Sequence, residues 1–73
     1  MGKLRTLSGK EVCAILLAYG FEQVRQKGSH VIMQKQVNLS TITVPVPQHK
    51  EIKAGTLVSI IRQAQLARSI FES

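Results

Sequence analysis

The first third of the chain repeats its hydrophobic positions with the period of an α-helix. Ser8 and Glu11 have the spacing of a capping box, in which each side chain binds the other residue's backbone N–H. Gly20 stands where a left-handed residue would end the helix. Cys13 lies inside this segment, where it is expected to fill the core rather than to react. The buried stripe of the predicted helix is Val12, Ile15, Leu16 and Tyr19.

A second amphipathic segment lies near the end of the chain. It is predicted to begin between Ile52 and Thr56, and Arg62 and Gln63 face outward on it. A short further turn is expected from Leu66 to Phe71. The apolar stripe of this second helix consists of Leu57, Ile60, Ile61 and Ala64.

Between the two helices the hydrophobic period changes to two, which is typical of β-strands. The alternation from Phe21 to Gln36 is interrupted at Gly28-Ser29, and Gly28 can supply the positive φ that a tight hairpin turn requires. A turn at 37–39 leads to a third strand, Ser40–Val46, which is rich in β-branched residues. Pro45 predicts an edge or a bulge there, because proline cannot donate to a ladder. The order is α-β-β-β-α, an α+β fold with a three-stranded antiparallel sheet and both helices on one face.

A two-residue loop at Gly28-Ser29 sets the register of the hairpin. Paired residues point to the same side of a sheet and successive residues alternate. The expected pairs are Lys27 with His30, Gln26 with Val31, Arg25 with Ile32, and Val24 with Met33. The core face then collects Val24, Val31 and Met33, together with Ile42, Val44 and Val46 of the third strand. The solvent face collects Gln23, Arg25, Lys27, His30, Ile32 and Gln34, with Thr41 and Thr43.

The composition and charge of the chain predict a polyanionic partner. The chain has 73 residues, enough for a single domain (1–73), with 10 Lys+Arg against 4 Asp+Glu and a formal net charge of +6 at pH 7. So dense a positive charge favours binding to phosphates, although membranes and acidic proteins are anionic too. The single Cys13 is typical of a reduced, cytosolic protein. The longest apolar run, Val12–Tyr19, is much shorter than the ~20 residues that span a bilayer, so no membrane association is expected.

Arg25, Lys27 and His30 on one exposed face suggest a phosphate site. On the residues alone, a solvated hairpin with an incidental histidine remains the alternative. The four acidic residues are scattered, and no Cys/His cluster has metal-ligand spacing, so neither a metal nor another cofactor is expected. RNA carries its own nucleophile, the 2′-OH, and an imidazole can accept a proton near neutral pH. The residues therefore permit metal-independent RNA cleavage.

Several segments, in this order and spacing, resemble the HicA toxins. They are Ser8-Gly9-Lys10-Glu11-Val12, Gly20-Phe21, Gly28-Ser29-His30, Val44-Pro45-Val46-Pro47, Lys50-Glu51-Ile52-Lys53-Ala54-Gly55-Thr56-Leu57 and Ile60-Ile61-Arg62-Gln63-Ala64. The family often has proline where Ala54 stands. HicA-like proteins are small mRNA-cutting toxins of bacterial and archaeal toxin–antitoxin systems, with a fold similar to double-stranded-RNA-binding domains. The resemblance implies a cytoplasmic protein, mRNA as substrate and a HicB-like antitoxin that blocks the RNA site.

The resemblance also assigns roles to residues of this chain. It implies that His30, which follows the Gly28-Ser29 pair, is the catalytic residue. The residues expected to bind RNA are Arg25, Lys27, Gly28 and Ser29, with Lys50 and Lys53 as a second basic group before the last helix. His49 is an auxiliary candidate, although an exposed loop histidine is the simpler interpretation. Two other functions remain open: a non-catalytic double-stranded-RNA-binding module, and a protein-interaction domain with a basic sheet.

Overall fold

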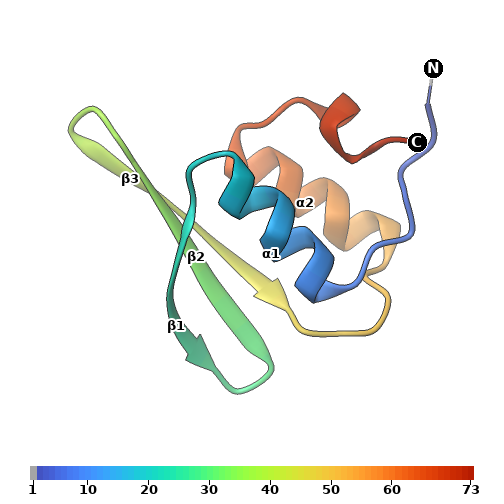
Figure 1. Cartoon of the computed structure of the whole chain (residues 1–73), viewed down its shortest axis with the longest axis horizontal. Helices are drawn as coiled ribbons and strands as arrows, with labels where there is room; N and C mark the ends of the chain where they lie inside the picture. The colour runs from blue at the N-terminus through green and yellow to red at the C-terminus, as the bar shows by residue number, and fades with distance from the viewer. Residues whose placement is uncertain (1) are drawn as a thin grey trace.

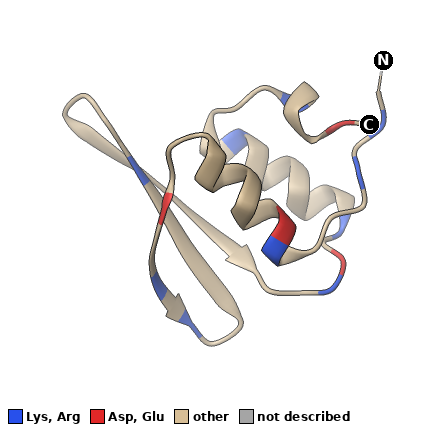
Figure 2. Cartoon of the chain, viewed as in Figure 1, with Lys and Arg blue, Asp and Glu red and all other residues tan. Residues whose placement is uncertain are grey.

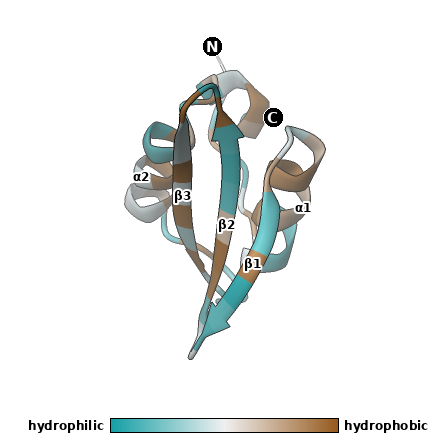
Figure 3. Ribbon diagram, turned by 90° about the vertical axis from the view of Figure 1, so that its left-hand side faces the viewer, coloured by the Kyte–Doolittle hydropathy of each residue, from teal (hydrophilic) through white to brown (hydrophobic). Residues whose placement is uncertain are grey.

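The computed structural model describes residues 2–73 and has the predicted α-β-β-β-α architecture (Figure 1). Met1, the first residue of the expected domain, lies outside the described residues. The strands form one antiparallel sheet in the order β1-β2-β3, and both helices cover the same face of it. Viewed from the side, α1 lies beside β1 and α2 beside β3 (Figure 3). The elements are α1 (Gly9–Ala18), β1 (Glu22–Lys27), β2 (His30–Val37), β3 (Ser40–Pro47), α2 (Ala54–Ala64) and a 3₁₀ turn, η1 (Arg68–Phe71).

The first helix begins and ends at the residues that the pattern predicted. The Ser8 hydroxyl accepts a hydrogen bond from the Glu11 backbone N–H at 3.1 Å, and the Ser8 N–H donates to the Glu11 carboxylate at 2.8 Å. Gly20 follows the helix with a φ of +95°. The expectation that Tyr19 belongs to the buried stripe is wrong. It is the C-cap and is 44% exposed, because the chain leaves helical geometry there.

The second helix buries its predicted stripe. It begins at Ala54, with Lys53 as its N-cap, and Gln65 ends it in the left-handed conformation at a φ of +58°. Arg62 and Gln63 are exposed, as expected. The buried residues of α2 are Leu57, Ile60, Ile61 and Ala64.

The β1–β2 hairpin has the predicted register next to its turn and a bulge beyond it. Lys27 pairs with His30, and Arg25 pairs with Ile32. The register then shifts between Gln23 and Arg25, so that Gln23 rather than Val24 opposes Met33. The assignment of Val24 to the core face is therefore wrong, whereas Gln23 is exposed as expected although it lies opposite the buried Met33. Val24 is the additional residue of a β-bulge and is 44% exposed.

The β2–β3 pairing confirms the predicted alternation. Val44 and Val46 are fully buried on the helix side, and Thr41 and Thr43 are exposed on the other face. Pro45 is exposed and lies on an edge strand, where its missing N–H leaves the ladder with β2 intact.

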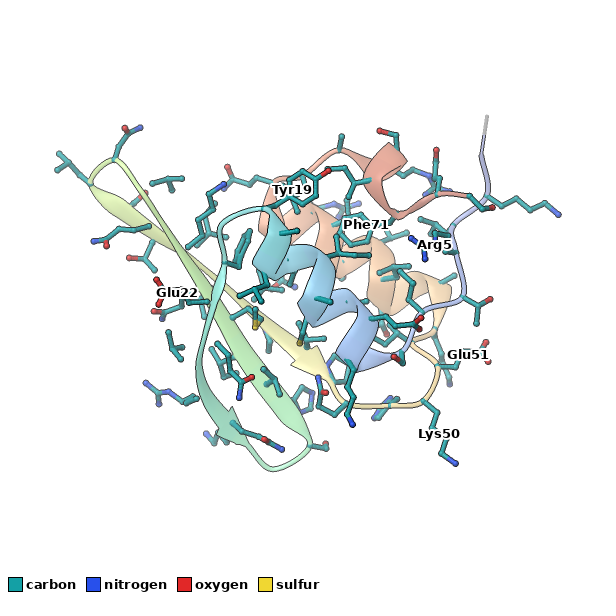
Figure 4. The ribbon with its side chains drawn as sticks, viewed as in Figure 1. Arg5, Tyr19, Glu22, Lys50, Glu51 and Phe71 are labelled. Atoms are coloured by element: carbon teal, nitrogen blue, oxygen red, sulfur yellow. The ribbon has the colours of Figure 1, made fainter. Side chains whose placement is uncertain are left out.

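The two ends of the described chain add to the core in a way that periodicity did not predict. Leu7 and Phe71 are among the most deeply buried side chains. The N-terminal segment runs beside the C-terminal one, since the Arg5 N–H donates to the Phe71 carbonyl at 2.9 Å. Figure 4 shows Phe71 directed inward, toward the helices.

Candidate nucleic-acid interface

The hairpin register places three of the expected site residues on one exposed face. His30 begins β2 and is paired with Lys27 on one side and with Pro47 on the other. Arg25 lies two residues before Lys27 on the same strand, so both side chains point away from the core. All three side chains are exposed. The imidazole is therefore accessible to a large ligand and has two cations nearby.

The turn that carries His30 is fixed by its backbone. Gly28 has a φ of +61°, a conformation that strains any residue with a Cβ. The side-chain amide of Gln26 donates to the Gly28 carbonyl at 3.3 Å. The Ser29 carbonyl accepts a 2.7 Å hydrogen bond from the Gln48 N–H. The hairpin turn is thus attached to the loop between β3 and α2.

That loop is held in turn against the start of α1. The Gln48 side-chain amide donates to the Val46 carbonyl at 3.2 Å and lies 3.6 Å from the Cys13 sulfur. The His49 carbonyl accepts from the Gly9 N–H at 2.9 Å. Burial raises the pKa of the Cys13 thiol, which is consistent with the expected core role of this residue. His49, which the sequence could not place, therefore lies in a loop that is bonded to the His30 hairpin.

Lys10 belongs to this region, and sequence reasoning missed it. A hollow beside the start of α1 is lined by Ser8, Lys10, Gln48, His49 and Lys50. Lys10 and Lys50 are exposed, and Lys50 extends away from the body of the protein (Figure 4). Lys10 had no distinguishing signal, because an outward lysine in the first turn of a helix is normally a solvated residue. Basic residues thus lie on β1, at the start of α1 and in the β3–α2 loop (Figure 2).

The remaining predicted residue, Lys53, is separate from this hollow. It is exposed at the N-cap of α2 and makes no side-chain capping bond. The structure thus brings His49 and Lys50 together with Lys10, while Lys53 is not among the residues that line the hollow.

Within residues 2–73, no group of three or more His, Cys, Asp or Glu side chains could hold a metal ion. In the same range, no helix is long and apolar enough to cross a membrane. Glu11 is engaged in its capping box, and hydrogen bonds from Ser8, chiefly from its backbone, lower the pKa of the Glu11 carboxyl.

In a comparison with known protein families, one family matches the chain. The family described as HicA toxin of bacterial toxin–antitoxin systems matches residues 9–66. This range contains both helices, the whole sheet, the His30 hairpin and the loop with His49 and Lys50. No curated protein matches the chain.

Proposed function

The chain belongs to the HicA toxin family and is a toxin of a toxin–antitoxin system, and from this premise we propose that it acts by cutting RNA. The observation that carries the proposal is the position of His30. It is exposed at the start of β2, opposite Lys27 and on the same face as Arg25. An accessible proton acceptor with two cations nearby is the minimum that RNA cleavage without a metal needs.

In the proposed reaction His30 acts as general base. Its imidazole takes the proton from a ribose 2′-OH, and the 2′ oxygen attacks the adjacent phosphorus. The bond from phosphorus to the 5′ oxygen breaks, and that oxygen takes a proton from water. The products are a 2′,3′-cyclic phosphate and a 5′-hydroxyl end.

The basic side chains would stabilise the charge that develops on the phosphate. Lys27 is directly opposite His30, and Arg25 is next along the same face of β1. Lys10 and Lys50, with Lys53 beyond them, would bind phosphates on the other side of the turn. Gly28 would leave room for the RNA backbone beside the exposed Ser29, because it has no side chain and no atom lies within 4 Å of where its Cβ would be.

His49 is the second candidate for proton transfer. Its loop is tied to the His30 hairpin through the bond between Gln48 and Ser29. If His49 transfers a proton, His49→Ala lowers kcat and leaves the RNA affinity unchanged. If it binds phosphate, the same change weakens affinity instead.

The regulatory partner is the second part of the proposal. Membership of a toxin–antitoxin family implies an antitoxin. We expect it to be a HicB-like protein that covers the face around His30 and so competes with RNA. If a saturating antitoxin left RNA cleavage unchanged, this blocking mechanism would be refuted.

The test is cleavage of single-stranded RNA in the presence of EDTA. The wild type should cut and leave 2′,3′-cyclic phosphate ends, whereas His30→Ala should bind RNA but not cut it. Arg62→Ala, a change on the exposed side of α2, serves as the purification and folding control. Products with 5′-phosphate and 3′-hydroxyl ends would contradict the proposed route.

The alternative is a non-catalytic double-stranded-RNA-binding module. It is favoured by the fold and by the basic residues on both sides of the hairpin turn. The same assay separates the two functions. If neither the wild type nor His30→Ala cuts RNA and both bind duplexes, the binding module is correct.

A further inference from the structure

The outer face of the sheet continues past the basic residues into a shallow hollow. Its lining consists of Glu22, Val24, Gln34, Gln36 and Thr41. The hollow encloses about 230 Å³, less than the ~300–1,000 Å³ of pockets that hold a whole drug-sized ligand. Its size therefore suits a single planar group rather than a larger molecule.

The β-bulge contributes to this hollow. The register shift between Gln23 and Arg25 turns Val24 to the outer face, where its side chain is 44% exposed. Glu22 then opposes Gln34, and Thr41 opposes Gln36. The Gln34 amide donates to the Thr43 hydroxyl at 3.3 Å, which holds this side chain in place. An apolar surface is thus combined with amide, hydroxyl and carboxylate groups.

The hollow lies on the same strand and the same face as the proposed catalytic residue. His30 and Gln34 are four residues apart on β2, so they are separated by roughly 13 Å at the usual rise of ~3.3 Å per residue. Arg25 and Lys27 lie between the hollow and the turn. A single RNA strand held at His30 could therefore follow this face and reach the hollow.

The chemistry of the lining selects a base rather than a phosphate. Glu22 would repel a phosphate, but a carboxylate accepts hydrogen bonds from an exocyclic amino group. Such amino groups occur on adenine, cytosine and guanine, whereas uracil has none. Amide and hydroxyl groups can bind the remaining edge of an unpaired base, and Val24 can pack against its plane.

We propose that this hollow is a specificity site that binds one unpaired, amino-bearing base of the RNA near the cut. The proposal rests on the proposed function for its role in cleavage. Glu22 is the residue that discriminates against uracil, whose only ring donor, N3–H, is flanked by two carbonyl oxygens that repel a carboxylate. Gln34, Gln36 and Thr41 hold the base. The toxin is then selective for the sequence that flanks its cutting position.

Binding to uncuttable RNA tests the site separately from catalysis. The probes are fluorescent 2′-O-methyl oligoadenylate, oligocytidylate and oligouridylate of equal length, which lack the attacking hydroxyl. The wild type should bind the adenylate and cytidylate about three- to ten-fold more tightly than the uridylate, the range of one net hydrogen bond. In Glu22→Gln this difference should largely disappear. Glu72→Gln, which changes the net charge equally but lies at the C-terminal end, should discriminate like the wild type.

Mapping of cut positions on a randomised single-stranded RNA completes the test. The wild type should avoid uracil at one fixed offset from the cut, and Glu22→Gln should lose that avoidance while still cutting. The inference is overturned if the wild type shows no base preference, or if Glu22→Gln keeps the wild-type preference. It is also overturned if Glu22→Gln weakens only inhibition by the antitoxin, since the hollow would then bind protein. If the protein discriminates between bases but cuts no RNA, the proposed function is refuted and the base-binding site is supported.

Discussion

Replacing Gly9 by alanine should destabilise this protein, although the same change in most helices is stabilising. Gly9 is the first residue of α1 and is buried against the end of β3 and the loop that follows it. An added Cβ would overlap the Pro47 carbonyl oxygen and lie 2.8 Å from the Cα of Gln48. Both of these neighbours are backbone atoms, so the loop can yield only by moving as a whole.

The expected magnitude follows from two opposing terms. Alanine is favoured over glycine inside a helix by about 0.8–1 kcal/mol, and by less at the first position. Forcing an additional methyl group into a closely packed site typically costs about 1–3 kcal/mol. We expect Gly9→Ala to lower the free energy of unfolding by a net ~1–2 kcal/mol. In a domain of this size that is a fall in Tm of about 5–15 °C.

Gly55 supplies a matched control within the same chain. It lies in the first turn of α2, and no atom is within 4 Å of where its Cβ would be. Gly55→Ala should therefore raise the free energy of unfolding by about 0.5–1 kcal/mol. Urea denaturation followed by circular dichroism measures both variants under the same conditions, and equal m-values would show that only stability has changed.

The Gly9→Ala variant should also cut RNA more slowly than the wild type, by more than the smaller fraction of folded protein explains. The loop that it displaces donates the Gln48 N–H to the Ser29 carbonyl, which fixes the turn before His30. At a temperature where Gly9→Ala is fully folded, we expect kcat to fall. If Gly9→Ala were as stable as Gly55→Ala, the close approach of α1 to this loop would be refuted.

Three further changes test other parts of the structure. Ser8→Ala removes the acceptor of the Glu11 N–H and should cost about 1 kcal/mol in urea denaturation. The folded pKa of Glu11 lies below its ordinary value, so its contribution to stability is present above that ordinary value and is lost as the pH falls through the lowered one. Ser8→Ala should keep most of this acid dependence, because the hydrogen bond from the backbone N–H of residue 8, its main cause, is retained. Phe71→Ala should cost about 3–5 kcal/mol, a large part of the stability of a small domain, and thermal melts that match the wild type would contradict the burial of this ring. Lys10→Ala should weaken RNA binding and reduce the slope of log affinity against log salt by about 1, whereas Arg62→Ala should leave the slope unchanged.

The features that the residue pattern predicted correctly are local ones. The Ser8 cap, the Gly20 end of the first helix and the Gly28 turn each depend on hydrogen bonds or dihedral angles within a few residues. The pairing of Lys27 with His30 follows directly from a two-residue turn. Since strand alternation then places His30 on the solvent face, the centre of the candidate site could be predicted from the order of residues alone.

The features that the residue pattern did not predict depend on contacts between distant segments. The register shift at Val24 depends on how β1 fits against β2 beyond the turn, and alternation alone assigned this residue to the wrong face. Phe71 is buried because the two ends of the described chain lie side by side. Lys10 reaches the region around His49 because α1 packs against a loop almost forty residues later in the chain. Periodicity reports which side of its own element a residue occupies, whereas the neighbours on that side are set by packing.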